Sequence, residues 1–143
     1  MMRIMTITVL LGISLWGAQT TKAVFDCAAK DMKFIASRMF LIEESAKELK
    51  AKKIPYTFIL TLHSGCTPIA VEEIGDDEVK RGISQRLKKL HNEYGVKIEA
   101  CEIALERFGI EKSDLPPYIG SVRNSITRVI ELQNDGYAFI PYH

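Results

Sequence analysis

Short apolar runs alternate with amphipathic stretches along this chain, and the alternation predicts strands followed by helices. Residues 23–27 and 56–62 are mainly apolar runs without a polar face, which is typical of strands buried on both sides of a parallel sheet. Between them, apolar residues recur three or four positions apart from Met32 to Leu49. This spacing predicts a helix, and Asp31 is placed to cap its N-terminus.

The same alternation continues to the end of the chain. The remaining predicted elements are a helix with Ile83, Leu87 and Leu90 on one face that ends at Gly95, a strand over 96–101, a short helix over 103–108, a strand over 118–122, a helix capped by Asn124 or Ser125, and a strand over 137–140. Because right-handed crossovers lay a helix over one face of a parallel sheet, this order predicts a three-layer α/β/α sandwich. Its sheet is expected to be mainly parallel and five-stranded, of flavodoxin-like or Rossmann-like type.

The residues ahead of the first predicted strand follow a different pattern. Residues 4–21 carry no charge, and Arg3 precedes them. The apolar run Ile4–Trp16 has the length of the hydrophobic region of a signal peptide and is short for a membrane span. We therefore predict that residues 1–22 are a signal peptide or an N-terminal anchor and that residues 23–143 form a single domain. This domain is expected to be periplasmic or otherwise exported, with membrane contact only if the segment is not cleaved.

Charge and motifs exclude several functions. The chain has 19 basic and 18 acidic residues, a net charge of +1, and the two signs are interleaved along its helices. No basic stripe suitable for nucleic acid is present, so nucleic acid is not an expected partner. The glycine-rich motifs of dinucleotide and phosphate binding are missing from the sequence, as is the G-x-S-x-G motif of hydrolases. No cofactor is therefore expected.

The three cysteines of the chain have a shared position in the predicted fold. Cys27 ends the first predicted strand, Cys66 comes just after the second, and Cys101 ends the third. In an open parallel sheet, ligands bind beyond the carboxyl ends of the strands. The sequence therefore places all three thiols at the functional edge, although Cys27 could simply be part of the core.

Cys101 has the strongest claim to reactivity. It stands where a strand gives way to a helix beginning near Glu102, so the N-terminal end of that helix would stabilise a thiolate. Glu99, Glu102 and Glu106 act against this, because nearby negative charge raises the pKa of a thiol. A buried and inert cysteine is the alternative.

Cys66 and His63 flank the turn after the second strand. Cys66 lies in a loop with Gly65 and Pro68, which suits either a nucleophile or a disulfide partner. His63 could act as a base or a metal ligand, or could be a hydrogen-bonded structural residue. Asp26, at the end of the first strand, has an ordinary structural explanation, and no C-x-x-C spacing supports a metal site.

Part of the sequence forms a recognisable family pattern. Its segments are Val96–Cys101, Ala104–Leu105, Arg107–Ile110 and Leu132–Ile140. Together they resemble the DsrE/DsrF-like family of small sulfur-relay proteins, and the resemblance extends from Val24 to Pro141. It implies the sandwich fold already predicted, assembly into homo-oligomers, and a persulfide carried on a cysteine after the third strand. That role transfers to Cys101 alone.

We therefore expect a sulfur carrier or a sulfurtransferase-like protein. Cys101 would accept the sulfur, Cys66 would resolve or relay the persulfide, and His63 would shuttle protons. Export and the additional residues Cys27, Cys66 and His63 set this chain apart from cytoplasmic relay proteins. The combination implies a role in periplasmic sulfur-compound or thiol redox metabolism. Sulfur donor and acceptor proteins, or small thiols, are the expected partners.

Two alternatives remain open at this point. The chain could be a non-catalytic binding module in which Cys66 and Cys101 form a structural disulfide, or in which the cysteine cluster holds a metal. It could also be an assembly subunit that retains the fold without the chemistry.

Overall fold

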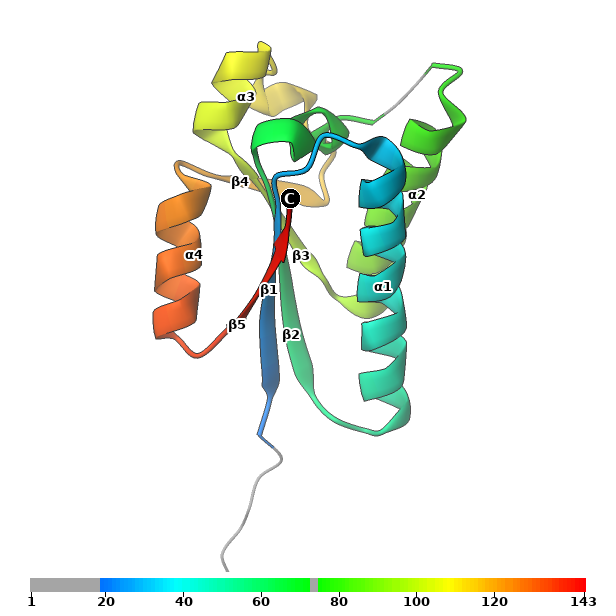
Figure 1. Ribbon diagram of the computed structural model, residues 1–143, viewed down its shortest axis with the longest axis vertical. Helices are drawn as coiled ribbons and strands as arrows, with labels where there is room; N and C mark the ends of the chain where they lie inside the picture. The colour runs from blue at the N-terminus through cyan, green and yellow to red at the C-terminus, as the bar shows by residue number, and fades with distance from the viewer. Residues whose placement is uncertain (1–18, 73–74) are drawn as a thin grey trace, which may run out of the picture.

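Strands and helices alternate through the part of the chain that the computed structural model describes, residues 19–72 and 75–143 (Figure 1). In chain order the elements are β1 (Thr21–Cys27), α1 (Met32–Ala51), β2 (Tyr56–Leu62), the 3₁₀ helix η1 (Ser64–Ala70), α2 (Glu78–Tyr94), β3 (Lys97–Cys101), α3 (Glu102–Phe108), the 3₁₀ helix η2 (Lys112–Asp114), β4 (Ile119–Val122), α4 (Ser125–Asn134) and β5 (Ala138–Tyr142). The predicted strands and helices are confirmed. The loop predicted after β2 is in fact η1.

The five strands form one parallel sheet in the order β4-β3-β2-β1-β5. Helices α1 and α2 pack side by side on one face, and α4 covers the other, which confirms the three-layer sandwich (Figure 1). The connection through α4 carries the chain across the whole sheet, from β4 at one edge to β5 at the opposite edge. β5 contains Pro141, a residue without an N–H that an edge strand accommodates.

The two faces of the sheet differ in what they bury. The face under α1 and α2 carries the main hydrophobic core, which includes Ile35, Leu60 and Ile98. The face under α4 has a smaller apolar cluster of Val24, Ile59, Val129 and Leu132. Because side chains alternate between faces along a strand, Asp26 and Thr61, two positions after Val24 and Ile59, also lie under α4. Both are polar, so the α4 face is apolar near the amino ends of the strands and polar near their carboxyl ends.

Side-chain and glycine caps set the helix ends that position the site. Asp31 accepts a hydrogen bond from the backbone N–H of Phe34 at the start of α1, and Asn124 accepts one from Ile126 at the start of α4. Gly109 has a φ of 65° and ends α3, where a residue with a side chain would be strained. Each of these caps is recognisable in the sequence.

The N-terminal prediction falls mostly outside the described residues. Strand β1 begins at Thr21, so the folded domain starts slightly before residue 23, the predicted boundary. The backbone N–H of Thr21 donates to the carbonyl of Pro55, which ties this first residue of the strand to the loop before β2. In the part of the chain with described coordinates, no helix is both long and apolar enough to span a bilayer.

Candidate functional site

A cleft of about 430 Å³ opens at the carboxyl edge of the sheet. It lies between the start of η1, helix α3 and the N-terminal end of α4. Its lining residues are Lys30, His63, Ser64, Gly65, Cys101, Ile103, Ala104, Arg107, Phe108, Asn124, Ser125 and Ile126. The structure therefore brings His63 and Cys101, two of the residues predicted from the sequence, to one cleft.

Cys101 is a free cysteine, almost fully buried, at the wall of this cleft. The backbone N–H of Ser125 donates to its Sγ at 3.5 Å. Ser125 is the first residue of α4, so the positive end of this ten-residue helix points toward the sulfur. Both the hydrogen bond and the helix dipole favour negative charge on the sulfur, which is the form of a cysteine that acts as a nucleophile.

A buried ion pair holds α4 in this position. Glu99, on β3 beneath α4, accepts hydrogen bonds from Nε and a terminal nitrogen of Arg128 at 2.9 and 3.2 Å. Lys97 lies 2.8 Å from the same carboxylate. Burial alone would raise the pKa of Glu99, but these partners bring its pKa below the usual value. The ionised pair thus fixes α4 on the sheet, and with it the N–H of Ser125 at Cys101.

The acidic residues around Cys101 are all paired with cations. Besides Glu99, the carboxylate of Glu102 accepts hydrogen bonds from Lys112 at 2.8 Å and Ser121 at 2.9 Å, and these bonds lower the pKa of Glu102. Glu106 is paired with Arg123. Negative charge on these acids was expected to raise the pKa of the Cys101 thiol. Their cationic partners, which the sequence did not reveal, offset that effect.

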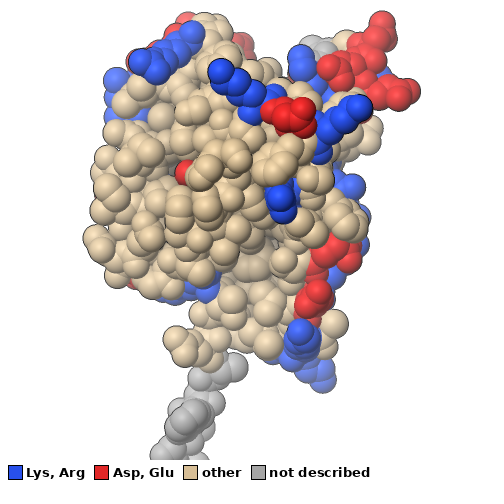
Figure 2. Space-filling model, viewed as in Figure 1, with Lys and Arg blue, Asp and Glu red and all other residues tan. Residues whose placement is uncertain are grey.

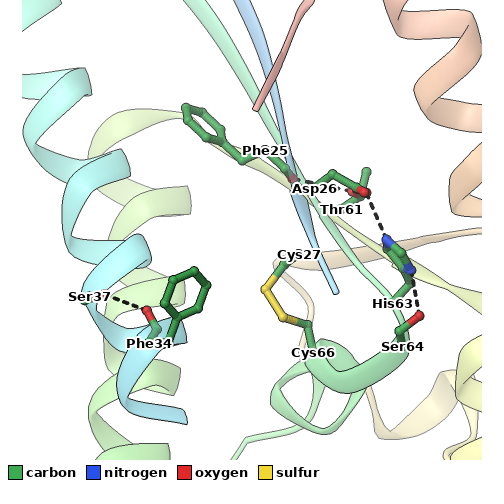
Figure 3. Close-up of a disulfide and its surroundings, with 9 residues drawn as sticks. All are labelled: Phe25, Asp26, Cys27, Phe34, Ser37, Thr61, His63, Ser64 and Cys66. Atoms are coloured by element: carbon green, nitrogen blue, oxygen red, sulfur yellow. Dashed lines mark hydrogen bonds and ion pairs between the residues drawn. A yellow bond between two sulfur atoms is a disulfide. The ribbon is translucent and has the colours of Figure 1, made fainter. Parts of the chain in front are cut away.

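His63 is held by hydrogen bonds to Asp26, at the end of β1, and to Ser64, the next residue in the chain (Figure 3). Its Nε2 lies 3.0 Å from Oδ1 of Asp26, and its Nδ1 lies 3.0 Å from Oγ of Ser64. Thr61 on β2 donates its hydroxyl to the same Oδ1 of Asp26 at 2.6 Å. Asp26 and Thr61 stand opposite each other in the β1–β2 register, so the sheet itself builds this contact.

The charge of Asp26 sets the tautomer of the neutral His63 ring. Burial would raise the pKa of Asp26, but the hydrogen bonds from His63 and Thr61 bring it below its usual value. The ionised carboxylate only accepts, so Nε2 of His63 carries a proton and donates it to Asp26. In the neutral ring, Nδ1 is then unprotonated and accepts a hydrogen bond from the hydroxyl of Ser64, which lines the cleft together with His63. Because its pKa is lowered in the folded state, the ionised carboxylate of Asp26 stabilises the fold at neutral pH. This stabilisation is lost only as the pH falls through the lowered pKa of Asp26.

Cys66 forms a disulfide with Cys27, with the two Cα atoms 5.7 Å apart (Figure 3). The alternative pairing of Cys66 with Cys101 is therefore wrong. The reason lies in the turn after β2, which folds over the end of β1: His63 donates its N–H to the carbonyl of Cys27, and Gly65 donates to Ala28. Both bridged cysteines are fully buried, whereas Cys101 opens on the cleft.

The geometry argues against the metal alternative. Two of the three thiols are joined to each other. Within residues 19–72 and 75–143, no group of three or more His, Cys, Asp or Glu side chains is arranged to hold a metal ion.

Two contributors to the site were not predicted from the sequence. Asp26 was assigned an ordinary structural role, although a carboxylate inside a buried apolar run is a signal that it needs a partner. Ser125 was noted only as a possible helix cap. Its backbone N–H reaches Cys101 because β3 and β4 are neighbours, and that pairing is a property of the tertiary fold.

Known proteins with similar sequence or structure fit this architecture. The chain is 38% identical over 130 residues to an uncharacterized protein of Aquifex aeolicus (strain VF5), covering 87% of this chain but only 57% of that protein. The structure of MTH1491 from Methanobacterium thermoautotrophicum, a protein of unknown function, superposes with a TM-score of 0.63 at 20% identity, covering 85% of this chain and 99% of the other. The ychN protein from E. coli superposes with a TM-score of 0.55 at 9% identity, covering 86% and 100%. Both likenesses show the fold alone.

The family itself is shown by the sequence. The sequence model of the DsrE/DsrF-like family matches residues 22–142, which is nearly all of the described domain. Membership supports a general role of the sulfur-relay type. This small α/β/α protein, with its free cysteine at the carboxyl edge of a parallel sheet, belongs to the DsrE/DsrF-like family.

Proposed function

We propose that this protein carries sulfur as a persulfide on Cys101. The observation that carries the proposal is the position of this one free thiol: it faces a cleft and accepts a hydrogen bond from the first N–H of α4. A persulfide anion on Cys101 would be stabilised by the same helix end, because it also concentrates negative charge near the N-terminus.

The chemistry needs no oxidant. The Cys101 thiolate attacks the outer sulfur of a persulfide donor, a new S–S bond forms, and the bond between that sulfur and the donor breaks. The donor leaves as a thiolate with the electron pair. Attack by an acceptor thiolate on the outer sulfur of the Cys101 persulfide then returns Cys101 to its starting state.

His63 is the proton carrier in this proposal. In the neutral ring, Nδ1 is the unprotonated nitrogen, beside Ser64 in the lining of the cleft, and Asp26 holds the ring in that tautomer through Nε2. The imidazole takes the proton of the Cys101 thiol and returns it to the departing donor thiolate. Asp26 acts as a positioning residue, since its contact is with His63 and not with the reacting sulfur.

Cys66 can relay or resolve the persulfide only after its bond to Cys27 is reduced, because that bond occupies its sulfur. We therefore assign Cys66 a conditional role: reduction of the buried disulfide by an external dithiol, which is itself oxidised to a disulfide, frees a second thiol. Oxidised protein is expected to use Cys101 alone.

Export and assembly are further parts of the proposal. A disulfide between buried cysteines is supportive of a periplasmic or other oxidising location, because such bonds are rare in reducing compartments. Fractionation of cells that express the full chain tests this, and recovery only from the cytoplasm would contradict it.

Figure 2 shows a broad face with few charges over α4 and β5, where Ile130 and Phe139 are exposed. Self-association through that face is the expected basis of a homo-oligomer.

Intact-protein mass spectrometry tests the proposed function. The domain is first treated so that Cys101 is reduced and the Cys27–Cys66 bond is kept, and it is then exposed to a persulfide donor. The expected result is a mass gain of one or more whole sulfur atoms that is reversed by reductant and maps to the peptide containing Cys101. Absence of any gain at Cys101 would contradict the proposal.

Replacing His63 by glutamine is expected to slow sulfur loading at neutral pH by about 100-fold, the low end of what a positioned acid–base group contributes. Asp26→Asn removes the charge that orients His63 and is expected to cause a smaller loss. Because Asp26 acts through His63, the double variant should be no slower than His63→Gln alone. Loading rates are followed by quenched-flow mass spectrometry.

The matched control for this series is His91→Gln. His91 lies in α2 and contacts the carbonyl of Val96, away from the cleft, so its replacement should leave the loading rate unchanged. Additive losses in the Asp26/His63 double variant would contradict the positioning role of Asp26.

A non-catalytic binding module is the second candidate function. The buried Cys27–Cys66 disulfide favours it, because a bond of this kind stabilises a domain without any chemistry. It differs from the first in one respect that can be measured: a binding module retains its function when Cys101 is replaced.

A further inference from the structure

The walls of the Cys101 cleft are more apolar than sulfur transfer requires. Ile103, Phe108 and Ile126 all line it, and each remains exposed, at 37%, 50% and 56%. They come from two elements, α3 and α4. An inorganic sulfur anion would gain nothing from them. A ligand with an apolar body would cover all three.

The charged side chains of Lys and Arg that line the cleft are of one sign. Lys30 and Arg107 both line it, and no Asp or Glu is among its lining residues in the described part of the chain. Neither cation is paired with an acidic side chain within residues 19–72 and 75–143. The other cations near Cys101 are already committed, Lys112 to Glu102 and Arg123 to Glu106. Two uncommitted cations therefore remain to attract an anionic group.

The size of the cleft matches a small molecule. A volume of about 430 Å³ lies within the range of sites that bind small ligands. Cys101 and His63 form part of its lining, so a ligand seated there would meet the nucleophile and the base together.

We propose that the cleft takes as its sulfur donor a small organic persulfide with an apolar body and an acidic group. This deepens the proposed function and rests on it. The apolar body lies on Ile103, Phe108 and Ile126, and the acidic group lies toward Lys30 or Arg107. The persulfide then points its outer sulfur at Cys101.

The transfer balances within this pair of reactants. The donor R–S–SH and the thiol of Cys101 give R–SH and a Cys101 persulfide. The S–S bond of the donor breaks, the new bond forms between Sγ of Cys101 and the transferred sulfur, and the electron pair leaves with the donor sulfur. That sulfur receives the proton that His63 took from Cys101, so no outside oxidant or reductant takes part.

The test compares three donors at equal concentration. These are the persulfide of a mercapto acid that bears a phenyl group, the persulfide of mercaptoacetic acid, and sodium polysulfide. Each rate of Cys101 loading is divided by the rate of the same donor with free cysteine, which removes differences in intrinsic reactivity. The phenyl acid is expected to load Cys101 at least about tenfold faster than either of the others, the discrimination that a small apolar group gives in a hydrophobic pocket.

Two isoleucines on α4 provide a matched pair of variants. Ile126 lines the cleft and Ile130, one turn later, does not, although both side chains are more than half exposed. Ile126→Ser is expected to reduce the advantage of the phenyl acid severalfold without changing loading by polysulfide. Ile130→Ser is expected to change neither loading rate, even where it weakens self-association through the α4 and β5 face, because the residues that line the cleft come from one chain and do not include Ile130. Arg107→Gln together with Lys30→Gln should reduce loading by all three donors, because polysulfide is also an anion, and should leave the advantage of the phenyl acid over mercaptoacetic acid persulfide unchanged.

The outcomes separate this inference from the function on which it rests. Equal normalised rates for all three donors, with Cys101 still loaded, would overturn the proposed donor class and leave the persulfide function intact. Equal effects of Ile126→Ser and Ile130→Ser would also overturn it. Failure of every donor to load Cys101 would overturn both.

Discussion

Replacement of Cys101 by serine is expected to abolish sulfur loading. Serine keeps the size of the side chain, and its hydroxyl can accept the same hydrogen bond from the N–H of Ser125. The hydroxyl, however, ionises far less readily than a thiol and cannot hold sulfur as a persulfide. No other free thiol is present while the Cys27–Cys66 bond is intact. Intact-protein mass spectrometry after donor treatment should therefore show no gain.

The control is the Cys27→Ala/Cys66→Ala double variant, which lacks the disulfide and retains Cys101. It should still load Cys101 under conditions where it is folded. Full loading of the Cys101→Ser variant would place the acceptor elsewhere and contradict the proposal. Loss of loading in both variants with an unchanged circular dichroism spectrum would show that the disulfide contributes to the chemistry as well as to the fold.

The same double variant is expected to lower the free energy of unfolding by about 4 kcal/mol, the loop-entropy value for a bridge that closes about 40 residues. The sequence separation of Cys27 and Cys66 is 39. Lost packing adds to this, because both side chains are fully buried in the main core. For a domain of this size, such a loss is a large part of the total stability. Urea unfolding of the oxidised wild type and the variant measures the difference.

Two comparisons show whether the disulfide causes this loss. Reduced wild type should resemble the double variant in its midpoint, whereas the oxidised Cys101→Ser variant should resemble oxidised wild type. Reduced and oxidised wild type with equal midpoints would contradict a stabilising role for the bond.

The sequence was sufficient to predict the elements because their signals are local. The spacing from Met32 to Leu49 and the cap at Asp31 define α1, and Gly95 ends α2 in the left-handed conformation. Alternation of strands with helices then leaves few topologies, and the predicted placement of all three cysteines at one edge is confirmed by the strand ends.

The contacts in the site were harder to predict from the sequence, because they depend on which strands become neighbours. Asp26 meets Thr61 only when β1 pairs with β2 in the observed register, and Ser125 reaches Cys101 only because β4 lies beside β3. The disulfide partner of Cys66 depends in the same way on how the turn after β2 crosses the end of β1. Such contacts join residues far apart in sequence, and no local pattern specifies them.

The position of β5 also has a consequence for how the chain is synthesised. β1 pairs with β2 on one side and with β5 on the other, so one edge of the first strand stays unpaired until β5 has been synthesised. While the ribosome is still translating α4, that edge has free N–H and C=O groups, a state that favours pairing with other chains. The finished sheet can form only once β5 has been synthesised, so the first strand stays half paired until then.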